Sequence, residues 1–263
     1  MSIEEGFFDF AAEVGLTKHL GSLESTERLI DLCQIKAGDY VLDVGCGVGA
    51  TPIYLAKQIG CRVMGVDIIP CMVDRSQELA DKQELSHLAA FRVADAQELP
   101  FPDNHFDVVI TESVTAFPED KQRAVNEYAR VLKPGGYVGL NESTWLKKPI
   151  PEEVTSWTSR QVGSSATPLL REEWTELLNR AGFKDLSVEI QEIDIKEEAA
   201  GIMRRYGFFS MMRVIGRTFK LYLKSPSYRE FAKDLKKEGI TPENLPEYFG
   251  YGIYVGRKID EKD

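Results

Sequence analysis

Between residues 39 and 142, short apolar runs alternate with stretches whose apolar residues recur every three to four positions. The short runs predict strands, and the longer period predicts amphipathic helices. The predicted strands are Tyr40–Val44, Arg62–Val66, Ala90–Ala94, Phe106–Thr111 and Tyr137–Asn141. The predicted helices are about Pro52–Ile59, Met72–Gln83 and Glu119–Leu132. This alternation is typical of βαβ units in a parallel sheet, which binds its ligand beyond the carboxyl ends of its strands.

After residue 142 the alternation is less regular. Helices are predicted over about Glu152–Gln161 and over a stretch that ends at Gly182. Two further strands are predicted at Ser187–Ile195 and Gly250–Lys258, separated by a long segment with helical character. The fold class is therefore α/β, a doubly wound and mostly parallel sheet of seven strands with a helical insertion near the C-terminus.

Composition narrows the class of protein. The chain has 263 residues with 43% hydrophobic and 28% charged positions, which is ordinary for a globular protein. Its net charge of −10 disfavours a general nucleic-acid binder. The four cysteines lack the spacing of a zinc site, so no metal is expected. The N-terminus is acidic and no apolar stretch approaches a membrane span, so a cytoplasmic location without a transmembrane segment is expected.

A glycine-rich loop follows the first strand. Gly45, Gly47 and Gly49 permit positive φ angles and let the backbone approach a ligand closely. Thr51 is the expected N-cap of the next helix, with a proline after it in the first turn. Such a helix N-terminus attracts an anionic group. The loop alone is ambiguous, because Gly45-x-Gly47-x-x-Ala50 also fits a dinucleotide-binding fingerprint with a ribose-binding acid downstream.

Other motifs accompany this loop in a fixed order. Asp43 precedes the first glycine, Asp67 ends the second strand, and Asp95-Ala96 ends the third. A Leu-Pro-Phe-Pro-Asp-Asn-His-Phe-Asp segment begins at position 99, and Arg-Val-Leu-Lys-Pro-Gly-Gly begins at position 130. Together the motifs resemble the class I S-adenosylmethionine-dependent methyltransferases, specifically the small-molecule branch with the menaquinone, sterol and tocopherol C-methyltransferases. The resemblance covers residues 37–142 closely and 169–195 loosely.

The resemblance implies a Rossmann-like methyltransferase fold and S-adenosylmethionine as cofactor. The expected organisation is a helical arm over the active site in residues 1–36, the cofactor-binding core in 37–195, and the last strand and tail in 250–263. Residues 196–249 form an insertion or lid, where the chain departs from the simplest family pattern of a hairpin between the last two strands. Asp67 would accept hydrogen bonds from both ribose hydroxyls, and Asp95 would accept one from the adenine amino group. The expected cofactor-binding residues are Asp43, Gly45, Cys46, Gly47, Gly49, Asp67, Ile68, Met72, Asp95, Ala96 and Glu112.

Catalytic residues are harder to predict for this chemistry. A sulfonium is an activated methyl donor with a neutral leaving group, so in-line displacement depends mainly on alignment. A general base is needed only when the acceptor must lose a proton. The candidates are His19 in the arm, and Glu112 and Glu142 at the ends of the fourth and fifth strands. Each has a structural alternative, as a packing histidine or as a solvated or helix-capping carboxylate.

The insertion has its own charge and apolar content. Residues 196–238 contain 11 Lys and Arg against 5 Asp and Glu, and three of the six methionines. One interpretation is a helical cap with its basic side chains in solvent. The other is a lid that forms an apolar acceptor pocket and touches an anionic membrane surface through residues 199–224. We therefore predict methyl transfer to a small hydrophobic or lipid-like molecule.

Two rival functions stay open at this point. An NAD(P)-dependent oxidoreductase would use the same glycine loop, although Gly49 and the Asp95-Ala96 pair argue against it. A non-catalytic S-adenosylmethionine-binding protein would retain every cofactor residue. The sequence predicts neither the attacked atom nor the oligomeric state.

Overall fold

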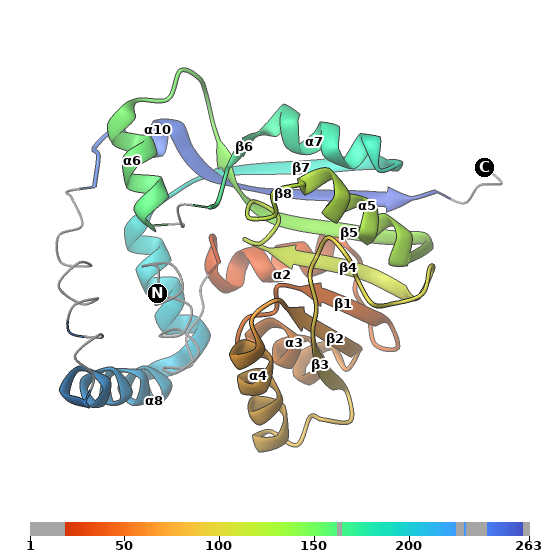
Figure 1. The fold of residues 1–263 in the computed structure, drawn as a ribbon, viewed down its shortest axis with the longest axis horizontal. Coiled ribbons are helices and arrows are strands. Elements are labelled where there is room, and N and C mark those ends of the chain that lie inside the picture. Colours follow the sequence, from red (N-terminus) through yellow and green to blue (C-terminus); the bar gives the residue numbers. More distant parts are fainter. Residues whose placement is uncertain (1–18, 162–164, 225–228, 230–240, 260–263) are drawn as a thin grey trace.

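The computed structural model describes residues 19–161, 165–224, 229 and 241–259 of the chain. A single large sheet forms its centre, with helices packed on both faces (Figure 1). The strands are β1 (Tyr40–Val44), β2 (Arg62–Asp67), β3 (Ala89–Val93), β4 (Phe106–Glu112), β5 (Leu132–Trp145), β6 (Leu169–Leu170), β7 (Phe183–Glu192) and β8 (Phe249–Lys258). The order of the main path is β3-β2-β1-β4-β5-β8-β7, and β6 pairs with β5.

The predicted α/β fold is confirmed. The first five strands in the order of the sheet, β3-β2-β1-β4-β5, pair in parallel. Strand β8 runs antiparallel to both β5 and β7. Three strands differ from the prediction by more than a residue or two. β7 runs from Phe183 to Glu192, not from Ser187 to Ile195, and Ile195 already begins the next helix. The short β6 adds an eighth strand, and β5 is longer than predicted at both ends. Its continuous register with β8, from Tyr137 to Trp145, explains the C-terminal extension, because every added residue gains a neighbouring strand.

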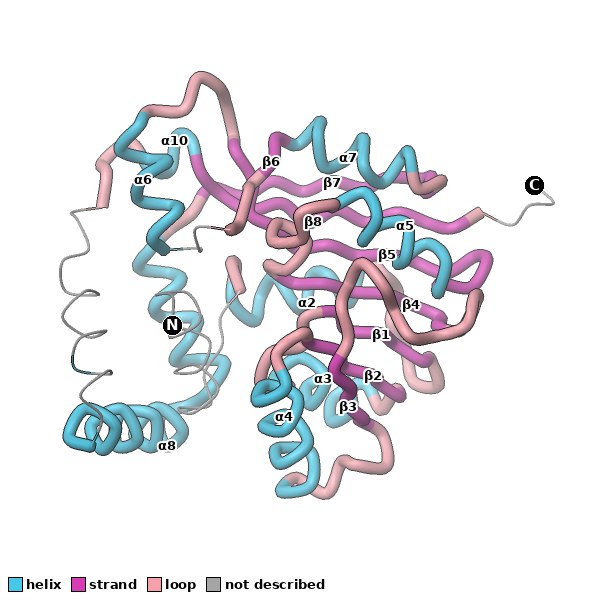
Figure 2. The backbone as a smooth tube through the Cα atoms, in the orientation of Figure 1, coloured by secondary structure: helices cyan, strands magenta, loops and turns pink. Residues whose placement is uncertain are grey.

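The helices lie between and beside these strands. Those described are α2 (Ser22–Leu32), α3 (Ala50–Tyr54), the π-helix η1 (Leu55–Ile59), α4 (Pro70–Lys82), α5 (Lys121–Val131), α6 (Glu152–Gln161), α7 (Arg171–Arg180), α8 (Ile195–Lys224) and α10 (Leu245–Tyr248). Figure 2 shows the helices in cyan around the magenta sheet, with α6 and α8 to the left of it.

The hydrophobic core is split into two layers by the sheet. Side chains alternate along each strand, so Leu42 and Val109 join one buried cluster while Val41 and Val108 join the other. The first cluster packs under α5 and α7, and the second packs under α2 and η1. Because both faces are covered, the central strands are apolar along most of their length, as is usual for a parallel sheet. Their buried polar residues, such as Asp43 and Asn141, lie toward the carboxyl ends.

The helix after the glycine loop begins earlier than predicted. Its N-cap is Gly49, in the left-handed region at φ 81°, and the first helical residue is Ala50. Thr51 is therefore not the N-cap, and this prediction is wrong. The Thr51 hydroxyl donates instead to the Glu112 carboxylate at 2.7 Å, across 61 residues of sequence. Gly49 enters the helix in the left-handed conformation, which a glycine adopts without steric cost, and no side chain caps the helix there.

Helices α8 and α10 lie in the insertion between β7 and β8. The first turns of α8 contact the start of α2: the Gly21 N–H donates to Glu198 Oε1 at 2.7 Å, and Arg204 pairs with Glu24 at 2.8 Å. The second half of α8 stands apart from the sheet (Figures 1 and 2). Among the described residues, no helix combines the length and the apolar character needed to cross a bilayer.

Candidate active site

A cavity of about 420 Å³ lies at the carboxyl ends of the parallel strands. The strand order places the ends of β3, β2, β1 and β4 side by side, about 4.8 Å apart. Asp95, Asp67, Asp43 and Glu112 therefore follow one another along one edge of the sheet. The cavity is lined by His19, Asp43, Val44, Gly45, Cys46, Gly47, Ala50, Thr51, Asp67, Ile68, Ile69, Met72, Ala94, Asp95, Ala96, Gln97, Glu112, Ser113, Val114, Phe117, Pro118 and Glu119.

The glycine loop presents main chain to this cavity. Gly45 adopts φ 75°, and its N–H donates to the Val66 carbonyl at 2.7 Å. A Cβ built at Gly45 would overlap the Val114 side chain, so glycine is required for space as well as for conformation. The Gly47 carbonyl accepts from the Ser76 hydroxyl at 2.8 Å, which ties the loop to α4. This part of the cavity wall is therefore main chain, fixed by hydrogen bonds to β2 and to α4.

Asp67 lies at the end of β2 and binds the loop directly. Its Oδ2 accepts from the Gly47 N–H and its Oδ1 from the Ile69 N–H, both at 2.9 Å. Burial raises the pKa of Asp67 above its ordinary value, and these backbone N–H groups oppose the rise. Each oxygen retains a lone pair for a ligand hydroxyl. The neighbouring Ile68 side chain is 63% exposed although it is aliphatic, and it forms part of the cavity wall.

The other predicted cofactor-binding residues lie on β1, on α4 and in the turn after β3. Asp95 Oδ1 accepts from the Gln97 N–H at 2.8 Å, in the turn after β3. Asp43 is buried in β1, and Met72 is buried in the first turn of α4. All the predicted cofactor residues line the cavity except Gly49, whose place is the helix N-cap.

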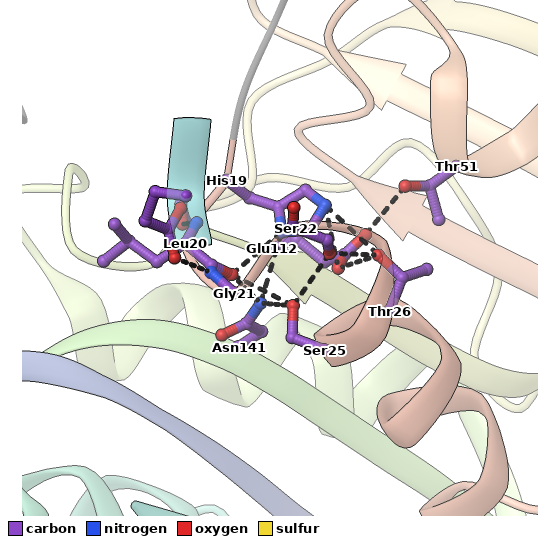
Figure 3. Close-up of polar contacts among 11 residues, drawn as sticks. His19, Leu20, Gly21, Ser22, Ser25, Thr26, Thr51, Glu112 and Asn141 are labelled. Atoms are coloured by element: carbon purple, nitrogen blue, oxygen red, sulfur yellow. Dashed lines mark hydrogen bonds and ion pairs between the residues drawn. The ribbon is translucent and has the colours of Figure 1, made fainter. Parts of the chain in front are cut away.

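Glu112 joins three elements at the β4 end of the cavity (Figure 3). Its Oε2 accepts from the Thr26 hydroxyl of α2 at 2.8 Å, and its Oε1 accepts from the Thr51 hydroxyl of α3 at 2.7 Å. The His19 Nε2 atom lies 3.4 Å from Oε2. The side chain is only 5% exposed, so this carboxylate exchanges bulk water for three protein partners. Sequence spacing gave no indication of these contacts.

The other ring nitrogen of His19, Nδ1, contacts two polar groups. Nδ1 lies 3.0 Å from the Leu20 carbonyl and 3.3 Å from Asn141 Nδ2. Asn141 also donates to the Leu20 carbonyl at 2.8 Å and is fully buried in β5. The segment that carries His19 is thus tied to the sheet, and the ring reaches the cavity with its Nε2 edge toward Glu112 (Figure 3).

Glu142 has a different environment from Glu112. It is fully buried in β5, and it does not line the cavity. Its carboxylate accepts from the N–H groups of Val114, Thr115 and Ala116 at 3.1, 2.6 and 3.3 Å. Burial raises the pKa of Glu142 to about 7, against the opposing effect of these N–H donors. The geometry suits a residue that positions the cavity-lining turn after β4 better than a residue that meets a substrate.

The sequence analysis did not predict Phe117, Pro118 and Gln97 as cavity residues. Phe117 and Pro118 lie on the turn after β4, which begins at Ser113 with a positive φ of 58°. Gln97 lines the opposite end. The unusual backbone at Ser113 could not be read from residue types, because a serine in the left-handed region is rare. The short Thr-Ala-Phe-Pro segment after a strand was the one available signal.

The residues present fit an adenosine-containing cofactor. The exposed Ile68 offers an apolar surface to a flat base, and Asp67 beside it offers two acceptor oxygens to a diol. The glycine loop provides a cradle at Gly45 that any side chain would fill. Among the described residues, no group of three or more His, Cys, Asp and Glu side chains could hold a metal ion.

Comparison with known proteins agrees with this geometry. The methyltransferase-domain family matches residues 42–140. The chain is 32% identical over 190 residues to 27-O-demethylrifamycin SV methyltransferase of Amycolatopsis mediterranei, covering 72% of this chain and 68% of that protein.

Solved structures with the same fold include enzymes of differing chemistry. Phosphoethanolamine N-methyltransferase 2 of Haemonchus contortus, with phosphomonomethylethanolamine and S-adenosylhomocysteine, superposes with a TM-score of 0.73 at 18% identity, covering 99% of this chain and 61% of that one. The [4+2]-cyclase SpnF superposes with a TM-score of 0.73 at 22% identity, covering 98% and 96%. At these identities the likeness extends to the fold alone.

Proposed function

Because this chain belongs to the class I S-adenosylmethionine-dependent methyltransferases, we propose that it methylates a small hydrophobic or lipid-like acceptor. Family membership decides against the NAD(P)-dependent oxidoreductase, for which the glycine loop alone left room. The chain is an enzyme that uses S-adenosylmethionine, and its acceptor is the subject of the proposal.

S-adenosylmethionine supplies a methyl group on a positively charged sulfur, which leaves as a neutral thioether. We assign its binding to the β1–β3 side of the cavity. Asp67 would hold the ribose hydroxyls and Ile68 would pack on the adenine, with Asp95 at the amino group. The glycine loop would support the methionyl portion. These residues bind and orient, and alignment of the reacting atoms supplies much of the rate.

The acceptor side of the cavity supports a hydrophobic molecule. Val114, Phe117 and Pro118 line the cavity on the turn after β4, beside the polar pair of His19 and Glu112. An apolar wall with a few convergent polar groups is the usual form of a small-molecule site. This combination is the observation that carries the proposal. The rifamycin relative also acts, by its name, on a demethylated rifamycin.

We assign proton transfer to His19 and Glu112 together. With Nδ1–H donating to the Leu20 carbonyl, Nε2 is the unprotonated ring nitrogen. It lies 3.1 Å from the Thr26 hydroxyl, and we assign to it the proton that the acceptor loses. The imidazolium that results lies 3.4 Å from the Glu112 carboxylate, which stabilises its charge. Thr26 and Thr51 hold that carboxylate in place. The pair therefore suits an acceptor that arrives protonated, such as a hydroxyl group.

Calorimetric titration with S-adenosylmethionine and S-adenosylhomocysteine is the first experiment. Micromolar binding of both is expected. Transfer of a labelled methyl group is then measured on two matched sets of acceptors: quinones, sterols and other lipids in one, and phosphoethanolamine and small acids in the other. Turnover on the first set is expected. Turnover on the polar set alone would contradict the proposed acceptor class, and the cofactor assignment would stand.

A further inference from the structure

The second half of α8 exposes a stripe of large apolar side chains. Its members, which we call the α8 stripe, are Met212, Ile215, Phe219, Tyr222 and Leu223, with exposures of 50, 56, 63, 43 and 61%. At 3.6 residues per turn they occupy an arc of about 100° around the helix. The half-buried Met211, Val214 and Thr218 lie next to the stripe, on one of its two flanks. The stripe itself is exposed along its whole length.

An exposed row of large apolar side chains is unusual on a protein whose hydrophobic content is ordinary and whose net charge is negative. Among the described residues, the other exposed large hydrophobic side chains are Ile68 in the cavity and the scattered Val93 and Ile259. Single exposed apolar residues are common, whereas a contiguous row marks a contact with another molecule or with lipid.

The charge beside the stripe indicates which partner it fits. Residues 199–224 contain six Lys and Arg and no Asp or Glu, although the whole chain has a net charge of −10. Arg213, Arg217 and Lys220 lie together along one edge of the stripe at helical spacing. Burial, with repulsion from Arg75 and Arg213, lowers the pKa of Arg217 below its ordinary value, and attraction to Glu78 opposes the fall only in part. This crowding of positive charge favours an anionic partner.

We propose that the α8 stripe docks on an anionic lipid surface, with its apolar side chains in the headgroup region and its basic edge at the phosphates. A helix with one apolar face and Lys and Arg beside it is the form of an interfacial membrane helix. A second copy of this chain fits less well, because a two-fold contact would place two basic edges together.

The location of α8 gives this contact a connection to the cavity. The same helix begins against Gly21 and Glu24, directly after His19. A bound membrane would thus lie against a helix anchored beside the cavity wall. Docking goes beyond the proposed function, because it requires neither the cofactor nor an acceptor.

Flotation of the full chain with vesicles is the test. One set contains phosphatidylcholine alone, and the other contains phosphatidylcholine with 30% phosphatidylglycerol. Binding to the anionic vesicles is expected to be at least about tenfold stronger, and to weaken as salt is raised. Equal partition to both sets, or no partition to either, would overturn the proposal.

Two variants separate the apolar and the charged contributions. Ile215→Ser with Phe219→Ser should reduce anionic-vesicle binding by about tenfold or more, since each removes an apolar anchor. Arg213→Glu with Lys220→Glu should reduce it similarly and abolish the salt dependence. The matched controls are Ile259→Ser and Lys184→Glu, exposed positions outside α8, which should bind as the unmodified chain does. Retained binding in both α8 variants would contradict the assignment.

Two additional measurements distinguish the outcomes. Light scattering across concentrations should show no dimer that depends on Phe219, and a dimer lost in Phe219→Ser would assign the stripe to a second copy instead. Titration with S-adenosylmethionine should be unchanged in every α8 variant, which shows that they fold. Vesicle binding with methyl transfer to the polar acceptors alone would overturn the proposed acceptor class alone. Methyl transfer to the hydrophobic acceptors without vesicle binding would overturn the docking alone.

Discussion

The two ends of the cavity are built in different ways. The cofactor end, formed by the glycine loop, Asp67, Ile68 and Asp95, depends on contacts between neighbouring segments. Asp67 binds the N–H of Ile69, two residues away, and of Gly47, 20 residues away. The arm end, formed by His19, Thr26, Thr51, Glu112 and Asn141, depends on side chains far apart in the sequence. Its contacts span 61, 86 and 122 residues.

The difference assigns separate tasks to the two ends. Backbone N–H groups and glycines form the cofactor end, so its shape follows from the βα turn itself. Side chains from α2, α3, β4 and β5 form the arm end, so its chemistry can change without changing the turn. We therefore expect substitutions at the arm end to alter turnover, and those at the cofactor end to alter cofactor affinity.

The largest expected effect concerns His19. His19→Asn removes the proposed proton acceptor and should lower kcat by about 10²–10⁴-fold, while S-adenosylmethionine affinity stays within about threefold. Steady-state kinetics with calorimetry measures both quantities. His87→Asn, in an exposed loop, is the matched control and should be unchanged. An equal loss of cofactor affinity in His19→Asn would show that the two ends are not separate.

The turn between the two ends should respond to pH through Glu142. Its pKa is about 7 in the folded chain against an ordinary value of 4.5, so the folded state binds the proton more tightly. Stability from this group is full below pH 4.5 and is lost as pH rises through 7. Glu142→Gln lacks this titration.

The pH dependence of the difference between the two proteins isolates Glu142, because the other groups titrate in both. The free energy of unfolding of the unmodified chain, relative to Glu142→Gln, should fall by on the order of 3 kcal/mol between pH 4 and pH 8. Denaturant unfolding at several pH values measures it. If the difference in unfolding free energy does not change with pH, the N–H groups of residues 114–116 offset the effect of burial on the carboxylate.

At the cofactor end, Asp67→Ala should weaken S-adenosylmethionine binding by about 1–3 kcal/mol through lost ribose hydrogen bonds. Calorimetric titration measures the change. Asp74→Ala, an exposed position on α4, is the control and should bind normally. Unchanged affinity in Asp67→Ala would show that the ribose assignment is wrong.

The smallest expected effect tests the connection that Glu112 makes between the arm and the glycine-loop helix. Thr26→Val and Thr51→Val each remove one hydrogen bond to its carboxylate. A double-mutant cycle should give a coupling of about 0.5–1 kcal/mol in unfolding free energy, because both hydroxyls share one acceptor group. Additive effects would mean that α2 and α3 respond independently.

Much of the fold was predictable because hydrophobic period is a local property. The predicted bounds of β1 and α6 agree with the structure, and the other strands of the parallel core differ mainly at their ends. The prediction of Thr51 as an N-cap was wrong for a non-local reason. Nothing in the residues near position 51 indicates that Glu112, on another strand, accepts its hydroxyl proton.

The sequence by itself determined the parallel α/β core, the glycine loop and the acids that end successive strands. Each of these depends on residues within one βα unit, where spacing and residue type are sufficient. Only the tertiary structure distinguished Glu112 from Glu142, which the sequence pattern placed at the ends of the fourth and fifth strands. Glu112 does end β4, whereas Glu142 lies within β5. One faces the cavity beside His19, and the other turns toward three backbone N–H groups. Packing between distant segments determines this difference, because a carboxylate is stable in a buried position only where hydrogen-bond donors contact it.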